Sequence, residues 1–522
     1  MQRSRLASKF LLPLAALSLM ALAGGCDKGG GGSVGGGASP SDPLYSFQWH
    51  LKNTGQDGGT AGEDANVEGV WASYKGSGVR IAVVDDGVEI THEDLADNVL
   101  SGAGYDYVDG DSTPDGAGAA GAMRHGTSVA GVAAAVGFNG KGVRGAAPSA
   151  SLVGYNLLMN LTDANAADAM NRGLAANDIY NNSWGPPDGT GLLDDSSSVW
   201  RAAIENGLAT GRGGKGAVYL WAAGNGDMVD NSNYDGNANY RGVFAVGALN
   251  DKGKKSSYSE KGANLLVSAH AGEFCDTNAV TTTDLSGAAG ESPDNYTHCF
   301  NGTSAATPLA SGVAALMLEA NPNLTWRDVR QILAETARKN DPTEADWTTN
   351  GAGLHINHNY GFGAVDAAAA VNAATAWTNM AVEKTPFIAV SAPNLPIEDA
   401  PSPDVLGAPA VDSITVSGSG MTAVEFVEVT FTSGHAYFGD LMIAIVSPAG
   451  TVSVLSEAHV CYDSADPPNQ APCGALYSAG WRFGVARLLG ESADGQWVIG
   501  VYDGGVGDIG TLQSWGLKIY GR

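Results

Sequence analysis

Three short segments, far apart along the chain, each place one chemically distinctive residue on a glycine-bearing turn. They are VVDDG at 83–87, RHGTSVAG at 124–131 and NGTSAATP at 301–308. In that order they supply a carboxylate, an imidazole and a hydroxyl, which are the groups that a nucleophilic hydrolase needs. Few folds present these groups in this chain order, so the trio restricts the architecture strongly.

The chemistry assigns a role to each residue. The hydroxyl of Ser304 is a poor nucleophile while protonated, so a neutral His125 must take its proton and Asp85 must hold the imidazole in the right tautomer. The chain order Asp, His, Ser favours the subtilisin arrangement over the chymotrypsin and α/β-hydrolase arrangements. Each motif alone is more often an ordinary turn, and it is their joint occurrence that predicts a catalytic site.

Local patterns place these residues at the ends of regular elements. The β-branched run at 79–84 predicts a buried parallel strand that ends at Asp85, where α/β sheets carry their sites. Runs of small and apolar residues after His125 and Ser304 predict two helices. The segment AVYLWAAGNGD at 217–227 predicts a strand and a turn that presents an amide to an oxyanion. We therefore expect an α/β parallel sheet flanked by helices, with Asp85, His125, Ser304 and Asn225 as the catalytic residues.

Length and composition predict a second domain. A chain of 522 residues exceeds what one hydrophobic core usually holds. Beyond 356–374, segments such as VEFVEVTFT and GQWVIGVYD alternate apolar and polar residues between turns, which predicts an all-β antiparallel sandwich. The net charge of −27 suits attraction of basic substrates and also ordinary solubility, and no nucleic-acid partner is expected.

The N-terminus reads as a targeting segment. Basic residues precede an apolar run that is too short to span a membrane, which predicts a signal peptide over 1–25. The run ends in LAGGC and resembles bacterial lipoproteins, whose cysteine is lipid-modified; here that residue is Cys26, followed by a Gly-rich tether over 26–41. We expect an exported, bacterial protein anchored to the cell envelope through Cys26, with a conventional cleaved signal and secretion as the alternative.

The other four cysteines fall into two pairs that are close in sequence. Cys275 with Cys299 and Cys461 with Cys473 lie in separate predicted domains. Two local disulfides are the simplest scheme in an oxidising compartment, although three connectivities are formally open.

Longer stretches of the chain resemble one branch of a known family. IAVVDDGVEITHEDL (81–95), NSWGPPDGTG (182–191) and LEANPNLTWRDVRQIL (318–333) resemble the kexin and furin branch of the subtilisin-like serine proteases. GDLMIAIVSPAGTVSVL and GTLQSWGLKIYG resemble the P domain, a jelly-roll unit that accompanies kexin-type catalytic domains. The resemblance implies a catalytic domain over 42–378 and a P-domain sandwich over 385–522.

The resemblance also implies a preference for basic residues. It assigns Asp188 and Asp235 to the pocket for an arginine or lysine side chain, whose donors suit carboxylates. Ala122 and Ala166 stand where relatives often carry acidic residues, so we expect weaker selectivity beyond the first position. The remaining expected substrate-binding residues are Asp86 for the second substrate position, Asp194 for more distant ones, and Ser183, Trp184 and Gly185 along the cleft.

Two calcium sites follow from the same resemblance. Hard oxygen ligands scattered through loops suit Ca²⁺ rather than zinc. The first site is expected beneath the pocket, with Asp188, Asp230 and Glu260. The second is expected to use Asp42, Asp94 and the loop residues Val136, Asn139, Lys141 and Val143.

Together these features predict a calcium-dependent serine endopeptidase that cuts proteins or peptides after basic residues, preferentially at dibasic sites, and works as a monomer. The alternatives are a broad degradative subtilase and an inert scaffold that binds through its sandwich. Relatives usually carry a folding propeptide, yet only a short Gly and Ser tract lies between Cys26 and Asp42. We therefore expect the P domain or a separate chaperone to assist folding.

Overall fold

A computed structural model of the protein describes residues 41–115, 123–227, 229–275, 278–403, 405–462, 470–471 and 473–522. Residues Pro40–Arg522 form one compact unit. The predicted signal peptide, Cys26, almost all of the predicted tether, and Ala122 lie outside the described residues.

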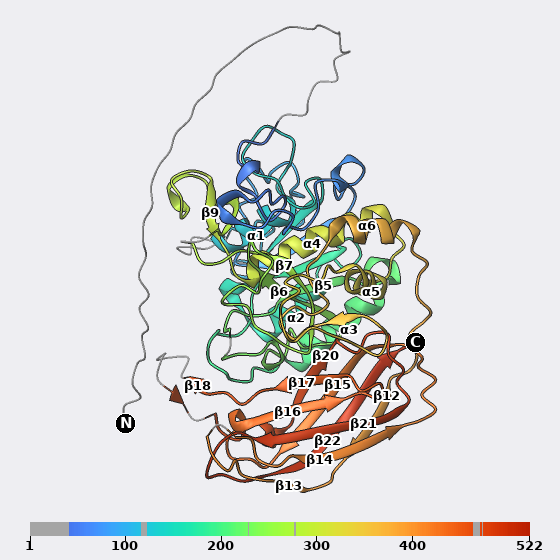
Figure 1. The fold of residues 1–522 in the computed structure, drawn as a ribbon. Coiled ribbons are helices and arrows are strands. Elements are labelled where there is room, and N and C mark those ends of the chain that lie inside the picture. Colours follow the sequence, from blue (N-terminus) through green and yellow to red (C-terminus); the bar gives the residue numbers. More distant parts are fainter. Residues whose placement is uncertain are drawn as a thin grey trace, which may run out of the picture. The chain divides into compact units, whose positions relative to one another are not determined.

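The first half of this unit is built on a parallel sheet of seven strands in the order β2-β3-β1-β4-β5-β6-β7. Figure 1 labels β5, β6 and β7 of this sheet, with helices around them. Its central strands are apolar almost throughout, because both faces of a parallel sheet are covered; every residue of β5 and β6 is buried. The strands are β1 (Arg80–Asp85), β2 (Tyr105–Asp106), β3 (Ser151–Asn156), β4 (Ile179–Asn182), β5 (Val218–Ala222), β6 (Val243–Leu249) and β7 (Leu265–His270).

Helices rich in small residues pack on this sheet. The helix α4 (Thr303–Ala320) contacts five strands and also α1 (Arg124–Ala134). A Cβ on Gly131 of α1 would lie only 2.1 Å from the hydroxyl oxygen of Thr283, so only glycine permits this close approach. The remaining helices are α2 (Asp163–Asn171), α3 (Ser198–Gly214), α5 (Trp326–Thr336) and α6 (Ala367–Ala376), and two short hairpins are β8 (Val280–Thr283) with β9 (Tyr296–Phe300) and β10 (Thr348–Thr349) with β11 (His355–Ile356).

The second half is an antiparallel sandwich with its own hydrophobic core. Residues on β21 alternate between buried and half-buried, and Trp497, Ile499 and Val501 point into the core. One sheet contains β12 (Phe387–Ser391), β13 (Leu395–Ile397), β22 (Gly510–Gly521), β15 (Val424–Ser433) and β20 (Trp481–Val485); the other contains β14 (Ala410–Val416), β21 (Gly495–Asp503), β16 (Leu441–Val446) and β17 (Val452–Ser456). The predicted fold class, a parallel α/β sheet followed by an all-β sandwich, is confirmed.

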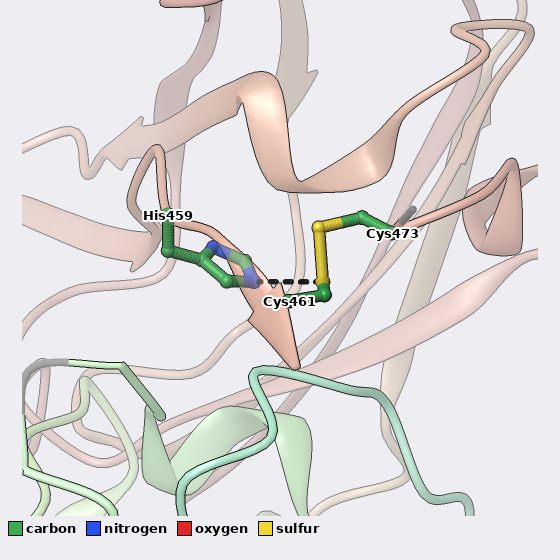
Figure 2. Close-up of side chains that lie close together, drawn as sticks. All are labelled: His459, Cys461 and Cys473. Carbon is green, nitrogen blue, oxygen red and sulfur yellow. Dashed lines mark hydrogen bonds between the residues drawn. A yellow bond between two sulfur atoms is a disulfide. The ribbon is translucent and has the colours of Figure 1, made fainter. Parts of the chain in front are cut away.

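Both predicted disulfides are present, Cys275–Cys299 in the α/β half and Cys461–Cys473 in the sandwich. The second one closes a small hairpin of β18 (Cys461–Tyr462) and β19 (Gln470–Ala471), with His459 beside it (Figure 2). Across the described ranges, no helix is both long enough and apolar enough to pass through a bilayer.

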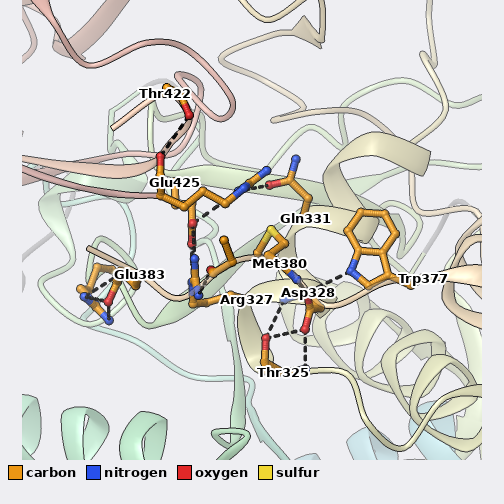
Figure 3. Close-up of polar contacts among 12 residues, drawn as sticks. Thr325, Arg327, Asp328, Gln331, Trp377, Met380, Glu383, Thr422 and Glu425 are labelled. Carbon is orange, nitrogen blue, oxygen red and sulfur yellow. Dashed lines mark hydrogen bonds and ion pairs between the residues drawn. The ribbon is translucent and has the colours of Figure 1, made fainter. Parts of the chain in front are cut away.

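Buried polar contacts join the two halves (Figure 3). Glu425 on β15 is 1% exposed and pairs with Arg327 of α5, whose Nε lies 2.6 Å away, and with Arg522 at 3.3 Å. The neighbouring Asp328 accepts hydrogen bonds from Trp377 Nε1 at 2.9 Å and from the Met380 amide at 2.8 Å. The segment that connects the two halves is therefore held against α5 by hydrogen bonds.

Candidate active site

Asp85 and His125 meet at the carboxyl end of β1. Asp85 is the last residue of β1 and is fully buried, and its Oδ1 lies 2.8 Å from Nδ1 of His125, the second residue of α1. Since a carboxylate accepts, Nδ1 carries the proton, and Nε2 of the neutral ring keeps the lone pair that a general base needs.

Asp86 fastens the start of α1 to this strand. Its Oδ1 accepts from the Gly126 amide at 2.8 Å and its Oδ2 from the His125 amide at 3.3 Å, which satisfies two free donors of the helix terminus. A Cβ on Gly126 would lie 2.0 Å from the Gly87 carbonyl oxygen, so glycine is required here. Asp86 therefore helps to hold the imidazole, and it does not line the cavity described below.

The local charges favour the protonated form of His125. Burial acts to lower its pKa, but the charges of Asp85 and Asp86 and the hydrogen bond to Asp85 outweigh burial and raise it to about 9. Burial and the charge of Asp85 raise the pKa of Asp86 to about 7. The imidazole still keeps 36% of its surface exposed, so a substrate can reach it.

Ser304 is the second residue of α4, directly after the turn at Gly302, whose φ is +85°. Its hydroxyl donates to the Ser183 carbonyl at 3.1 Å, and the Ser183 hydroxyl donates in return to the Ser304 carbonyl at 3.0 Å. Within the part of the chain that the structure describes, Ser304 has no hydrogen bond to His125, but both side chains line one cavity of about 280 Å³. Catalytic hydrogen bonds often tighten only when substrate binds.

Asn225 is held in a fixed orientation on the turn after β5. Its Oδ1 accepts from the backbone amide of Thr303 at 2.8 Å and from the Thr303 hydroxyl at 3.0 Å. Because these donors fix the oxygen, the NH₂ group points the other way, where it lies 3.3 Å from Asp188 Oδ2. Asn225 lines the same cavity as Ser304, so its second amide proton is available to an oxyanion.

The cavity is strongly acidic. Asp188, Asp230, Asp235 and Glu260 all line it, and the last three are only 7%, 6% and 5% exposed. No lysine, arginine or histidine within the described ranges forms an ion pair with any of the four. Burial raises the pKa of Asp235 to about 7 and that of Glu260 well above its usual range. Such uncompensated buried charge favours a cation in the cavity.

Glycines on the turn after β5 let two of these carboxylates lie against its backbone. A Cβ on Gly224 would lie 2.2 Å from Glu260 Oε1, and a Cβ on Gly226 would lie 2.1 Å from Asp230 Oδ2. The three acids predicted for the first calcium site nevertheless do not converge within 4.8 Å. Their oxygen chemistry suits Ca²⁺, and an ion would have to draw them together or take further oxygen ligands.

The residues predicted for the second calcium site are also brought together, but with a different balance of charge. Asp42 pairs with Arg144 and accepts from the Asn139 amide at 3.0 Å. Asp94 accepts from Asn139 Nδ2 at 2.7 Å and from the Val143 amide at 2.8 Å. Donors already satisfy both carboxylates, so this set fits a cation less well than the first set. The loop that contains Val136, Lys141 and Val143 wraps around the two acids; the Val136 amide donates to the Asp94 carbonyl.

A second cavity of about 290 Å³ adjoins the first and shares Trp184, Gly185 and Asp235 with it. Asp194, which the resemblance assigned to more distant substrate positions, lines this cavity together with Asp163 and Asp195, which sequence reasoning missed. The charges of Asp195 and Asp163, added to burial, raise the pKa of Asp194. Helical spacing could have identified Asp163, since it lies three residues before Ala166 on α2.

Comparisons with known proteins match both halves. Residues 76–363 match the Subtilase family, and residues 424–519 match the proprotein convertase P-domain. Human proprotein convertase subtilisin/kexin type 7 is 35% identical over 490 residues, and human furin is 33% identical over 501 residues; each match covers 92% of this chain. The chain spans about 60% of the length of these curated relatives.

One solved structure resembles the whole described unit. The serine protease of Aeromonas sobria, crystallised in complex with its chaperone, superposes with a TM-score of 0.81 at 29% identity. The match covers 92% of this chain and 95% of that protein.

Proposed function

The chain belongs to the subtilase family, and from that premise we propose that it is a serine endopeptidase that cleaves after arginine or lysine and depends on calcium. The observation that carries the proposal is one cavity that joins His125 and Ser304 to three buried carboxylates, for which the described part of the chain supplies no ion-pair partner. The guanidinium fork of arginine would satisfy such carboxylates, whereas a neutral side chain would leave their charge unpaired.

The residues at the cavity can carry out acyl transfer. As the Ser304 oxygen bonds to the carbonyl carbon of the substrate, its proton passes to Nε2 of His125, and Asp85 stabilises the resulting imidazolium. The NH₂ of Asn225 and the amide end of α4 face the developing oxyanion. The imidazolium then gives its proton to the leaving amine, and a water molecule, activated by the same imidazole, hydrolyses the acyl-enzyme.

Calcium would be held by Asp188, Asp230 and Glu260, where its charge would offset theirs. Asp235, which lines the same cavity, would then bind the basic side chain of the substrate. In the second predicted set, Arg144 already pairs with Asp42, so we assign the calcium dependence to the first set.

Cleavage of a peptide library by purified protein tests this function. We expect cleavage after arginine and lysine, and no cleavage by Ser304→Ala. Cleavage that is indifferent to the first residue would instead favour a broad degradative subtilase. Equal cleavage by wild type and Ser304→Ala would exclude this mechanism. The remaining candidate would then be an inert scaffold that binds through its sandwich.

The predicted export, the lipid anchor on Cys26 and the monomeric state belong to the same proposal. Assistance by a separate chaperone is supported by the Aeromonas sobria structure, which contains one. Refolding of the purified chain alone to full activity would contradict the need for a chaperone. When cells that express the protein are labelled with a radioactive fatty acid, we expect the label on the wild-type protein and none on the Cys26→Ser variant.

A further inference from the structure

One short stretch of the sandwich, residues 456–462, touches the α/β half at three places close to the acidic cavity. We call it the docking segment. It begins at the end of β17 and includes β18, and the disulfide to Cys473 ties its far end back to the sandwich (Figure 2).

The first contact is with the loop that contains Asp188. The Tyr462 amide donates to the Thr190 carbonyl at 2.8 Å, and Nε2 of His459 donates to the Gly191 carbonyl at 2.9 Å. Gly191 has a φ of +65°, and a Cβ there would lie 2.8 Å from His459 Cδ2, so glycine permits the contact. The next residues of this loop, Leu192 and Leu193, pack on the core of the sandwich.

The second contact is with the residue before Asp235. The hydroxyl of Tyr234 lies 2.9 Å from the Ser456 hydroxyl, and its ring stacks on His459 with centroids 4.9 Å apart. Tyr234 is only 3% exposed, so this contact is part of the packed interior.

The third contact is made by Lys261, the residue after Glu260, which forms an ion pair with Glu457. Asp230 is reached through the loop itself: the Gly191 amide donates to Asp230 Oδ1 while the Gly191 carbonyl accepts from His459. Every segment that supplies a carboxylate to the cavity is thus within a few residues of a contact with the docking segment, or one hydrogen bond removed from it.

We propose that the docking segment, with His459 at its centre, positions the carboxylates of the cavity and so sets its affinity for a basic side chain. Like charges crowded into a buried site repel, and their spacing must be imposed by groups around them. The sandwich supplies those groups from outside the catalytic fold. His459 is a positioning residue: it touches the loop and Tyr234, and it does not line the cavity. The choice of a basic side chain as ligand rests on the proposed function. The positioning role of His459 rests on the contacts alone.

Steady-state kinetics on the full chain test the inference. His459→Ala removes the hydrogen bonds of the imidazole to the Gly191 and Glu457 carbonyls and its ring contacts with Tyr234 and Phe438. This loss should raise KM for an arginine peptide about five- to tenfold and change kcat by less than about twofold. His459→Gln should restore most of the loss, because its amide can donate to the Gly191 carbonyl. The matched control is His358→Ala, which also breaks one bond between the halves, the 3.0 Å bond from the Val454 amide to His358 Nε2, but away from the cavity.

Unchanged KM in His459→Ala, or an equal rise in His358→Ala, would overturn the proposal. Hydrogen exchange of the 188–193 amides provides a readout that needs no catalysis, and we expect faster exchange in His459→Ala than in His358→Ala. If that difference appears while wild type shows no preference for basic residues, the proposed function fails and the positioning role stands; equal exchange overturns the positioning role. If His459→Ala fails to fold, the double variant Cys461→Ser, Cys473→Ser replaces it. That variant must show both the higher KM and the faster exchange of the 188–193 amides.

Discussion

Asp86, which lies next to Asp85 in the chain, influences both the position and the pKa of His125. Both of its carboxylate oxygens cap α1, and its charge acts on the imidazole that α1 carries. The sequence resemblance assigned this residue to the second substrate position, and the structure gives it a second role in holding His125.

The pH dependence of activity should report this role. His125 must be neutral to accept a proton, so kcat/KM should rise with pH through the His125 pKa, which Asp85 and Asp86 raise to about 9. Asp86→Asn removes one negative charge, so it should lower that pKa and move the acidic limb to lower pH by up to roughly one unit. The pH profile of kcat/KM is the measurement. Asp163→Asn, in the second cavity, should leave the limb in place, and an unmoved limb in Asp86→Asn would contradict the coupling.

Asp163 should contribute to selectivity upstream of the cleaved bond. Asp163→Asn removes a charge from the second cavity and should lower kcat/KM for peptides with an additional basic residue before the first by about three- to tenfold. Peptides without that residue should be cut as before. Asp168→Asn is the matched control, since Asp168 lies on the same helix and pairs with Arg172 instead. Equal loss on both peptides would argue against a subsite there.

The candidate catalytic residues could be located from sequence because each lies at the end of an element with a clear local pattern. Asp85 ends an apolar strand, and His125 and Ser304 start helices of small residues. Asp163 was missed because the resemblance directed attention to Ala166, one helical turn away. His459 was missed for a different reason: its role depends on a contact 268 residues away in sequence, with Gly191, which no local pattern encodes.

At the scale of elements, the joint between α5 and β15 is held by buried charge. Burial acts to raise the pKa of Glu425, but the hydrogen bond and charge of Arg327 outweigh it and hold that pKa below its usual range. The alternating pattern of the sandwich strands and the apolar runs of the sheet predicted both folds correctly. The pairing of Arg327 with Glu425 could not be predicted, because both residues read as ordinary exposed charges in their own segments.

Glu425→Gln should destabilise the protein. It leaves two guanidinium groups beside a neutral amide, and breaking a buried pair costs roughly 3 kcal/mol of unfolding free energy. Because the folded-state pKa is lowered, this stabilisation is present above the unfolded pKa of about 4.3 and is lost as pH falls through the folded value. Denaturant unfolding at pH 7 and pH 3 measures it. The exposed pair Lys52–Glu68 is the control, and Glu68→Gln should cost less than about 1 kcal/mol at either pH.

At the scale of the whole molecule, the chain combines a subtilase fold and a P-domain fold that share contacts. The predicted membership in the kexin and furin branch is confirmed by the matches to both domains. Helix α5 holds the segment that connects the two halves, and the docking segment holds the loops that supply the carboxylates of the cavity. The two halves should therefore unfold together.

Removal of the calcium that we propose for the cavity should test this coupling. With a chelator, the carboxylates of the cavity repel without compensation, so we expect a lower unfolding temperature and one calorimetric transition for both halves. Each tenfold rise in calcium above its Kd should add about 1.4 kcal/mol of stability. Asp230→Asn removes one buried charge, so it should be more stable than wild type in chelator and respond less to calcium. Two separate transitions, or an equal calcium response in Asp230→Asn, would contradict this view.

The acidic lining of the cavity also has a pharmacological consequence. A pocket whose walls carry fixed negative charge binds any small planar cation that fits, whether or not a peptide bond follows it. Amidines and guanidines, which are planar cations like the end of an arginine side chain, should therefore compete with substrate.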